Sequence, residues 1–154
     1  MKTWQKHCGE LLDSKNDFDV IACTSCEFKH IVPIPSEEEL KQVYEDDYYA
    51  EEKPIYIERM NEDLAWWNLS YDDRYDSFEE YLAAGQKSIL DIGSGPGLFL
   101  KRGEDRGWNV TGIEPSKQAF EYSSNTLGLK IHNTFFNKQT QQALDSFDVI
   151  HMSD

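Results

Sequence analysis

The sequence predicts an α/β fold, in which a doubly wound parallel sheet follows a helical segment and a small cysteine-bearing N-terminus. From Lys87 onward, short apolar strands alternate with helical stretches, the pattern of a parallel sheet. A glycine-rich turn at 93–97 follows the first strand, and all three cysteines lie within the first 26 residues. We therefore expect residues 1–35 to bind a metal, residues 36–86 to form a helical cap, and residues 87–154 to form the sheet domain.

The middle segment carries two helical patterns. Ser36 and Glu39 form a capping box, which predicts a helix start. An apolar stripe spaced by threes and fours then predicts a longer helix, with Ser70 and Asp73 as a place where it restarts. The stripe consists of Met60, Leu64, Trp67, Tyr71, Tyr75, Phe78 and Leu82. An aromatic run at helical spacing more often packs in a core than covers a ligand, so it is expected to be core. The run consists of Tyr44, Tyr48, Tyr49, Trp66, Trp67, Tyr71, Tyr75, Phe78 and Tyr81.

The sheet domain is expected to contain four strands and three helices. The strands are expected at Ser88–Ile92, Asn109–Glu114, Leu129–His132 and Phe147–Met152, and the helices at Gly97–Arg106, Ser116–Thr126 and Gln139–Leu144. Domains of this kind usually continue through more strands, so we expect either a fragment or the product of a short gene. The fourth strand would then be an apolar edge, and such edges tend to pair. We expect a homodimer contact or a swapped strand pairing there, and we expect His151 of this strand to be a packed core histidine.

The glycine-rich turn indicates the class of ligand. Gly93, Gly95 and Gly97 allow a sharp turn and a close approach of backbone to ligand. Asp91 precedes them at the strand tip, where a carboxylate would oppose the pyrophosphate of a dinucleotide. The spacing is G-x-G-x-G, and Leu98 occupies the position of the third glycine in the dinucleotide fingerprint. A carboxylate suits a cationic ligand, and S-adenosylmethionine carries an ammonium and a sulfonium.

Glu114 supports the same ligand. It lies 21 residues after Gly93 at the end of the second strand, where an acidic side chain can accept hydrogen bonds from both hydroxyls of a ribose. The alternative is a glutamate that merely caps the next helix. Pro115 and Ser116 follow, and Ser116 is a plausible cap for that helix.

Three motifs, L-D-I-G-S-G-P-G, G-I-E-P-S and F-D-V-I-H-M-S-D, resemble those of class I S-adenosylmethionine-dependent methyltransferases in order and spacing. The resemblance covers residues 88–154. It implies a partial Rossmann-like methyltransferase sheet made of the first four strands. It also implies that Asp91 and the glycine turn hold the methionine end of the cofactor, Glu114 the ribose, and residues after the third strand the adenine. Together the implied cofactor residues are Asp91, Gly93, Ser94, Gly95, Gly97, Glu114, Pro115, Thr134, Phe135 and Asp154. By analogy with similar methyltransferases, Tyr48 and Tyr49 are candidates for covering the cofactor.

The N-terminal segment resembles a half zinc ribbon that precedes some of these methyltransferases. Cys8 with Gly9 would form one knuckle, and Cys23 with Cys26 the other. Two departures stand out: Gln5 occupies the place of a first cysteine, and Glu27 replaces the usual knuckle glycine. The fourth zinc ligand would then be His7 or His30, with His7 preferred. The alternative is three reduced cysteines packed as small hydrophobes.

Net charge and cysteine content indicate which classes of binding partner and which cellular compartment the sequence favours. Residues 1–87 hold 9 Lys/Arg and 21 Asp/Glu, residues 88–154 hold 6 and 8, and the whole chain carries −14. This balance disfavours nucleic acid, and no apolar run is long enough for a membrane span. Few cysteines and no apolar leader indicate a cytoplasmic protein.

The sequence thus predicts a methyltransferase for a small-molecule acceptor, or its cofactor-binding fragment. The alternatives are a non-catalytic zinc- and cofactor-binding scaffold and, less favoured, an NAD-binding oxidoreductase fragment. No residue is assigned as a catalytic base.

Overall fold

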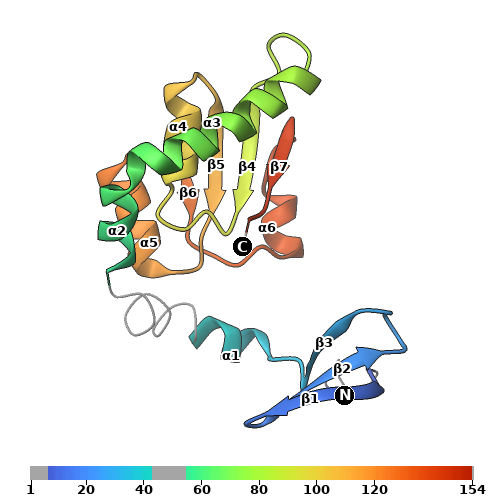
Figure 1. Cartoon of the computed structure of the whole chain (residues 1–154). Helices are drawn as coiled ribbons and strands as arrows, with labels where there is room; N and C mark the ends of the chain where they lie inside the picture. Colours follow the sequence, from blue (N-terminus) through green and yellow to red (C-terminus); the bar gives the residue numbers. More distant parts are fainter. Residues whose placement is uncertain (1–6, 43–54, 154) are drawn as a thin grey trace. The chain divides into compact units, whose positions relative to one another are not determined.

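The computed structural model describes residues 7–42 and 55–153, and Figure 1 follows the chain through them. The chain divides into two compact units, Met1–Lys41 and Gln42–Asp154. Our predictions for Tyr44, Tyr48, Tyr49 and Asp154 lie outside the described residues.

The first unit contains an antiparallel sheet in the order β1-β2-β3. Its strands are β1 (Gly9–Lys15), β2 (Phe18–Cys23) and β3 (Lys29–Val32). The sequence pattern did not predict these strands because β1 is exposed along its whole length and so shows no alternation between apolar and polar residues. Helix α1 (Glu37–Gln42) follows. Its predicted capping box is confirmed, since Ser36 N–H donates to Glu39 Oε2 at 2.7 Å and Glu39 N–H donates to Ser36 Oγ at 3.2 Å.

The second unit is built on a four-stranded parallel sheet in the order β6-β5-β4-β7. The strands are β4 (Ser88–Ile92), β5 (Asn109–Ile113), β6 (Ile131–His132) and β7 (Val149–His151). The first strand of the domain is thus central, as a doubly wound fold requires. The predicted α/β class and the four strands are confirmed, and the last two strands are shorter than expected.

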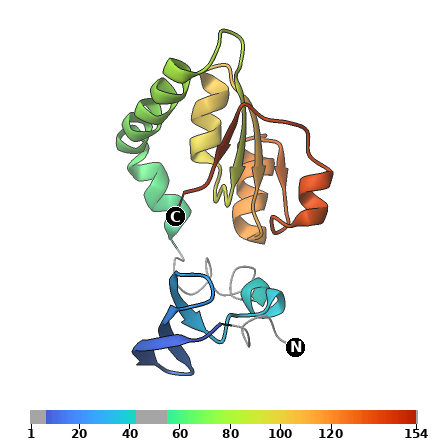
Figure 2. The same ribbon diagram turned by 90° about the vertical axis from the view of Figure 1, so that its right-hand side faces the viewer.

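Helices connect and cover these strands. They are α2 (Tyr56–Glu62), α3 (Leu64–Tyr81), α4 (Leu98–Asp105), α5 (Lys117–Glu121) and α6 (Lys138–Gln142). A π-helical turn, Tyr122–Thr126, continues α5. Ser116 caps α5 by accepting a hydrogen bond from Ala119 N–H, as predicted. Figure 2 shows α3 and α4 on one side of the sheet and α6 on the other.

The long helical stripe is interrupted at a different place from the one expected. We expected a restart near Ser70 and Asp73, yet α3 runs through both residues without a break. The interruption falls at Asp63, whose carbonyl accepts hydrogen bonds from Trp66 N–H at 2.9 Å and Trp67 N–H at 3.0 Å. Local capping residues therefore did not decide the boundary, because packing of the α3 stripe on the domain keeps that helix continuous.

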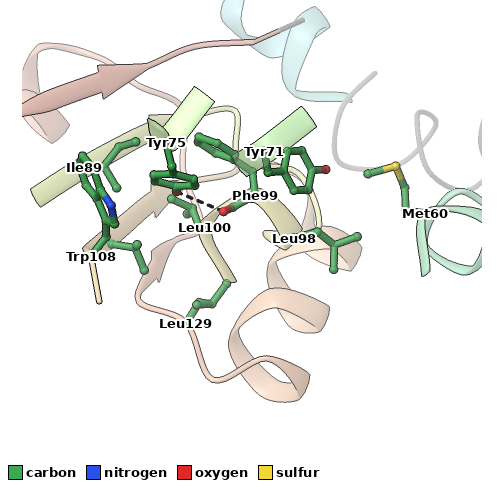
Figure 3. Close-up of a cluster of buried hydrophobic side chains, with 10 residues drawn as sticks. Met60, Tyr71, Tyr75, Ile89, Leu98, Phe99, Leu100, Trp108 and Leu129 are labelled. Atoms are coloured by element: carbon green, nitrogen blue, oxygen red, sulfur yellow. Dashed lines mark hydrogen bonds between the residues drawn. The ribbon is translucent and has the colours of Figure 1, made fainter. Parts of the chain in front are cut away.

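The core of this unit lies between α3, α4 and the sheet, and Figure 3 shows its side chains. The predicted packing of the aromatic run is confirmed at Tyr71 and Tyr75, which are buried, and it is wrong at Trp66 and Tyr81, which are 62% and 85% exposed. The Tyr75 ring stacks on Phe99 with centroids 4.7 Å apart, and its hydroxyl donates to the Phe99 carbonyl at 3.2 Å. A Cβ on Gly103 would lie 2.1 Å from Tyr75 Oη. The absence of a side chain at Gly103 thus allows α3 to approach α4 closely.

Ion pairs reinforce the contact between α3 and α4. Arg102 donates to both oxygens of Asp72 at 2.8 and 2.7 Å, and Arg106 donates to Asp72 Oδ1 at 3.0 Å. The hydrogen bonds from Arg102 are the main reason that the pKa of Asp72 lies at about 2. Trp108 Nε1–H and Lys87 both donate to Glu79. These bonds fix the rotation of α3 about its axis.

Strand β7 is the edge of the four-stranded sheet. Ile150 is 61% exposed and Met152, just after the strand, is 70% exposed. Pairing of this edge with a second copy of the chain stays a prediction. None of the helices that the structure describes is long and apolar enough to cross a membrane.

Gly103→Ala is expected to destabilise the protein by about 1–3 kcal/mol, because the added methyl group overpacks a fully buried tyrosine. This cost should outweigh the preference of about 1 kcal/mol that alanine has over glycine in a helix. Urea denaturation measures the effect. Glu104→Ala, on the neighbouring exposed position, is the control and should change the free energy of unfolding by about 0.5 kcal/mol or less. Equal stability of Gly103→Ala and the unmodified protein would contradict the packing described.

Candidate functional site

The predicted cofactor residues that the structure describes meet at the carboxyl edge of the parallel sheet. Because all four strands run in the same direction, their carboxyl ends lie at one edge, where the loops after β4, β5 and β6 gather in Figure 1. The loop after β4 is the glycine turn, Glu114 follows β5, and residues 133–135 follow β6. The sheet therefore brings together segments that are up to 42 residues apart in the sequence.

The glycine turn has the backbone conformation that its sequence predicts. Gly93, Gly95 and Gly97 have φ values of 79°, 53° and 79°, which side chains rarely adopt. Gly93 N–H and Ser94 N–H both donate to the Ile113 carbonyl, at 2.8 and 3.1 Å. A Cβ on Gly93 would meet nothing within 4 Å, so the turn leaves open space beside that residue.

Two buried carboxylates flank this turn. Asp91 and Glu114 are each 4% exposed. Glu114 Oε2 accepts from Gly95 N–H at 2.7 Å, and its Oε1 accepts from Ser116 N–H at 2.7 Å. Burial raises the pKa of Glu114, the two backbone hydrogen bonds oppose this shift, and the nearby charge of Asp91 adds to it. Two acidic groups close to one turn create a strongly electronegative site.

The loop after β6 is joined to the loop after β5 by Asn133. Its side-chain amide donates to the Glu114 carbonyl at 2.9 Å and the Pro115 carbonyl at 3.0 Å. Thr134 and Phe135 follow directly, so the predicted adenine-side residues lie next to the predicted ribose-side residue. Sequence analysis did not identify Asn133, because an asparagine in a loop carries no motif that would distinguish it.

His151 was predicted to be a packed core histidine, and the structure shows a further role. Its ring packs on Phe99 with centroids 4.3 Å apart. Its Nδ1 also lies 2.7 Å from Asp91 Oδ1, and its Nε2 lies 3.2 Å from Arg74 Nη1. Sequence analysis missed Arg74 and the polar role of His151 because both depend on the pairing of β7 with β4.

The residues at this edge fit S-adenosylmethionine in their chemistry. Asp91 offers an anion for a cationic group, and each oxygen of Glu114 keeps a second lone pair for a ribose hydroxyl. Ser94 Oγ is buried and has no hydrogen-bond partner among the described residues. A buried hydroxyl without a partner is costly, and a polar group of a bound ligand would satisfy it.

A second candidate site lies in the first unit. The ligand atoms of His7, Cys23, Cys26 and His30 all lie within 4.8 Å of one another. Two thiolates and two imidazoles form a donor set typical of tetrahedral zinc. His30 Nδ1 lies 2.8 Å from the Ile31 carbonyl, a contact that orients metal-binding histidines in many proteins. Its Nε2 is buried without a hydrogen-bond partner among the described residues and is therefore available as a ligand.

The structure groups the candidate zinc ligands differently from the sequence prediction. Cys8 was expected to be a ligand with either His7 or His30, whereas the structure brings in both histidines and leaves Cys8 out. Cys8 is exposed, and its Sγ lies 3.7 Å from Thr24 Oγ1. Neighbouring side chains of an extended chain point to opposite sides. Since His7 faces the cluster, Cys8 faces away from it.

The surroundings of Cys23 favour the thiolate form of this residue. Burial alone would raise the pKa of the Cys23 thiol, but the neighbouring His30 imidazole, the backbone amides of Cys26 and Ser25, and His7 lower it to about 5. A thiolate, rather than a thiol, is the form that binds metal. Glu27 has a φ of 63°, so it adopts the left-handed conformation in which a glycine would be expected.

Comparison with known proteins supports the fold and identifies the family. A solved structure of the plantazolicin methyltransferase BpumL in complex with SAH matches with a TM-score of 0.53 and 24% identity. The match covers 73% of this chain and 44% of that one, so the chain spans less than half the length of this relative. No curated protein matches the chain. A family model described as a methyltransferase domain matches residues 56–154, and the chain therefore belongs to this family, with the fold of a class I S-adenosylmethionine-dependent methyltransferase.

Proposed function

We propose that the chain binds S-adenosylmethionine at the carboxyl edge of β4 and β5 and serves methyl transfer to a small-molecule acceptor. The observation that carries this proposal is the pair of buried carboxylates, Asp91 and Glu114, on either side of the glycine turn. Two buried anions suit a ligand that carries positive charge at one end and a diol at the other. They would repel the pyrophosphate of a dinucleotide, so the proposal excludes an NAD-dependent oxidoreductase.

Each residue has a distinct part in this proposal. Asp91 would attract the ammonium of the methionine moiety, and Ser94 would donate a hydrogen bond to a polar atom near the turn. Glu114 would accept from the ribose hydroxyls while the Gly95 and Ser116 amides hold it in place. Thr134 and Phe135, placed beside Glu114 by Asn133, would border the adenine.

The protein's contribution to the reaction would be alignment and exclusion of water. When bound, the cofactor supplies a methyl carbon on a cationic sulfur, from which the lone pair of an acceptor displaces a neutral thioether. Because the leaving group is already good, holding the two reactants in line accounts for much of the rate. The buried carboxylates and the glycine turn would fix the donor, and no described residue is assigned as a base.

The charge of the chain is the basis for proposing a small acceptor. A net charge of −14 disfavours polyanions such as nucleic acids, which need basic patches on their partners. We propose a neutral or cationic small molecule for the same reason.

The N-terminal unit is proposed to hold a structural zinc ion through His7, Cys23, Cys26 and His30. Few of the described residues of this unit are buried and apolar, among them Ile21 and Cys23, so a metal would supply much of its stability. Structural zinc can supply the folding free energy of small segments of this kind.

Replacing Glu114 with Gln is expected to weaken S-adenosylhomocysteine binding about tenfold or more, because hydrogen bonds to a charged acceptor contribute about 1.5–3 kcal/mol. Isothermal titration calorimetry measures the affinity. Asp145→Asn removes the same charge at an exposed position and is the matched control, with binding expected to be unchanged. Tighter binding of NADH than of S-adenosylhomocysteine, or equal affinity in Glu114→Gln and the unmodified protein, would contradict the proposal.

The purified protein is expected to contain about one equivalent of zinc in a four-ligand site. Cys26→Ala should lose most of this metal, whereas Cys8→Ala should retain it, since Cys8 lies outside the cluster. Elemental analysis of the two variants, purified side by side, makes the comparison. Loss of zinc in Cys8→Ala as well as in Cys26→Ala would show that Cys8 is a ligand, whereas retention of zinc in Cys26→Ala would contradict both ligand sets.

A further inference from the structure

We propose that His151 is a positioning residue that Arg74 holds in one neutral tautomer, so that it fixes the Asp91 carboxylate as an anion facing the cofactor. This inference rests on the proposed function, because it concerns how that site keeps its charge. It involves three elements: α3 carries Arg74, β7 carries His151 and β4 carries Asp91.

Strand register makes His151 the neighbour of Asp91. In the parallel pairing of β4 with β7, Asp91 is aligned with His151, and in the pairing with β5 it is aligned with Gly112. Glycine has no side chain, so His151 is the one in-register side chain beside Asp91 on these two strands. The contact is short and shielded, with Nδ1 2.7 Å from Oδ1 and side-chain exposures of 13% for His151 and 5% for Asp91.

Arg74 determines which ring nitrogen carries the proton. Its Nη1 lies 3.2 Å from His151 Nε2, and a guanidinium can only donate hydrogen bonds. Nε2 must therefore be the unprotonated acceptor, and the single ring proton is on Nδ1, from which it is donated to Asp91. Protonation of both nitrogens would set a donor against a donor and a cation against a cation.

Packing holds the imidazole in this orientation. Its ring lies against Phe99 at 33° between planes, and Phe99 is itself stacked on Tyr75 in the core. Arg74 is also within 3.4 Å of Ser153 Oγ, which ties it to the chain just after β7. A ring flip would bring a carbon atom to Asp91 and would leave a buried charge without its donor, which is costly.

The hydrogen bond from His151 affects both the negative charge and the orientation of the Asp91 carboxylate in the cofactor site. A neutral histidine donates a hydrogen bond to Asp91 without cancelling its charge, whereas an imidazolium would neutralise it. Because Oδ1 is engaged by His151, the rotation of the carboxylate is fixed and Oδ2 can meet a cationic group. The contacts from Arg74 to His151 and from His151 to Asp91 thus link helix α3 to the end of β4, just before the glycine turn.

The tautomer can be observed without any cofactor. Nitrogen-15 NMR of histidine-labelled protein at pH 7.5 should show His151 as a neutral ring protonated at Nδ1. The His151 signals are assigned as those that disappear in His151→Asn. In Arg74→Met the Nε2 nitrogen loses the hydrogen bond that Arg74 donates, so its signal should shift while Nδ1 stays protonated towards Asp91. An imidazolium or an Nε2-protonated ring in the unmodified protein would overturn the inference.

Binding of S-adenosylhomocysteine tests the effect on the site. His151→Leu should weaken binding about tenfold, because a hydrogen bond to a buried charge is lost. His151→Asn should restore affinity to within about threefold, since an amide N–H can replace Nδ1–H. Ile150→Val, an exposed neighbour in the same strand, is the control.

The outcomes separate this inference from the proposed function. If the unmodified protein binds S-adenosylhomocysteine and His151→Leu binds it equally well, the positioning role is wrong. If the unmodified protein does not bind it, the proposed function fails, and the tautomer measurement still decides the Arg74–His151–Asp91 arrangement by itself.

Discussion

The in-register parallel pairing of β4 with both neighbouring strands is the constraint on which the candidate site depends. This pairing sets Asp91 between the bare backbone of Gly112 and the imidazole of His151. It also brings the Ile113 carbonyl to the glycine turn, where it accepts two hydrogen bonds. A shift of either neighbour by one residue would turn its side chains to the opposite face of the sheet, and the site would lose its geometry.

Helix α3 connects this site to the core. On one part of its surface Tyr75 is completely buried against Phe99 and Gly103. One residue earlier, Arg74 contacts His151. The ion pairs of Asp72 with Arg102 and Arg106 fix the same helix to α4. The core packing that stabilises the domain therefore also determines where Arg74 meets the site.

Local signals predicted the parts of the site that depend on backbone conformation. The glycine pattern predicted the turn because positive φ values select for glycine, and the acidic residue after the second strand pointed to Glu114 through its spacing. The helical stripe predicted the burial of Tyr71 and Tyr75. In each case the information lies within about 20 residues, which sets a helix face or a strand–turn–helix unit.

Contacts that depend on strand pairing could not be predicted in this way. Predicting the contact between His151 and Asp91 requires the order of the strands and their register, and the local sequence of β7 specifies neither. The exclusion of Cys8 requires knowing which side of the chain His7 faces as β1 begins. The continuity of α3 through Ser70 and Asp73 results from packing of that helix on the domain and not from a local capping signal. These features depend on tertiary structure, which overrides local preference.

The most direct measurement is a crystal structure of this chain with S-adenosylhomocysteine. The account predicts the ribose hydroxyls within hydrogen-bond distance of the Glu114 carboxylate and the amino group of the ligand beside Asp91, with His151 still in contact with that residue. A ligand bound away from the carboxyl edge of β4 and β5, or a ribose that does not contact Glu114, would contradict it.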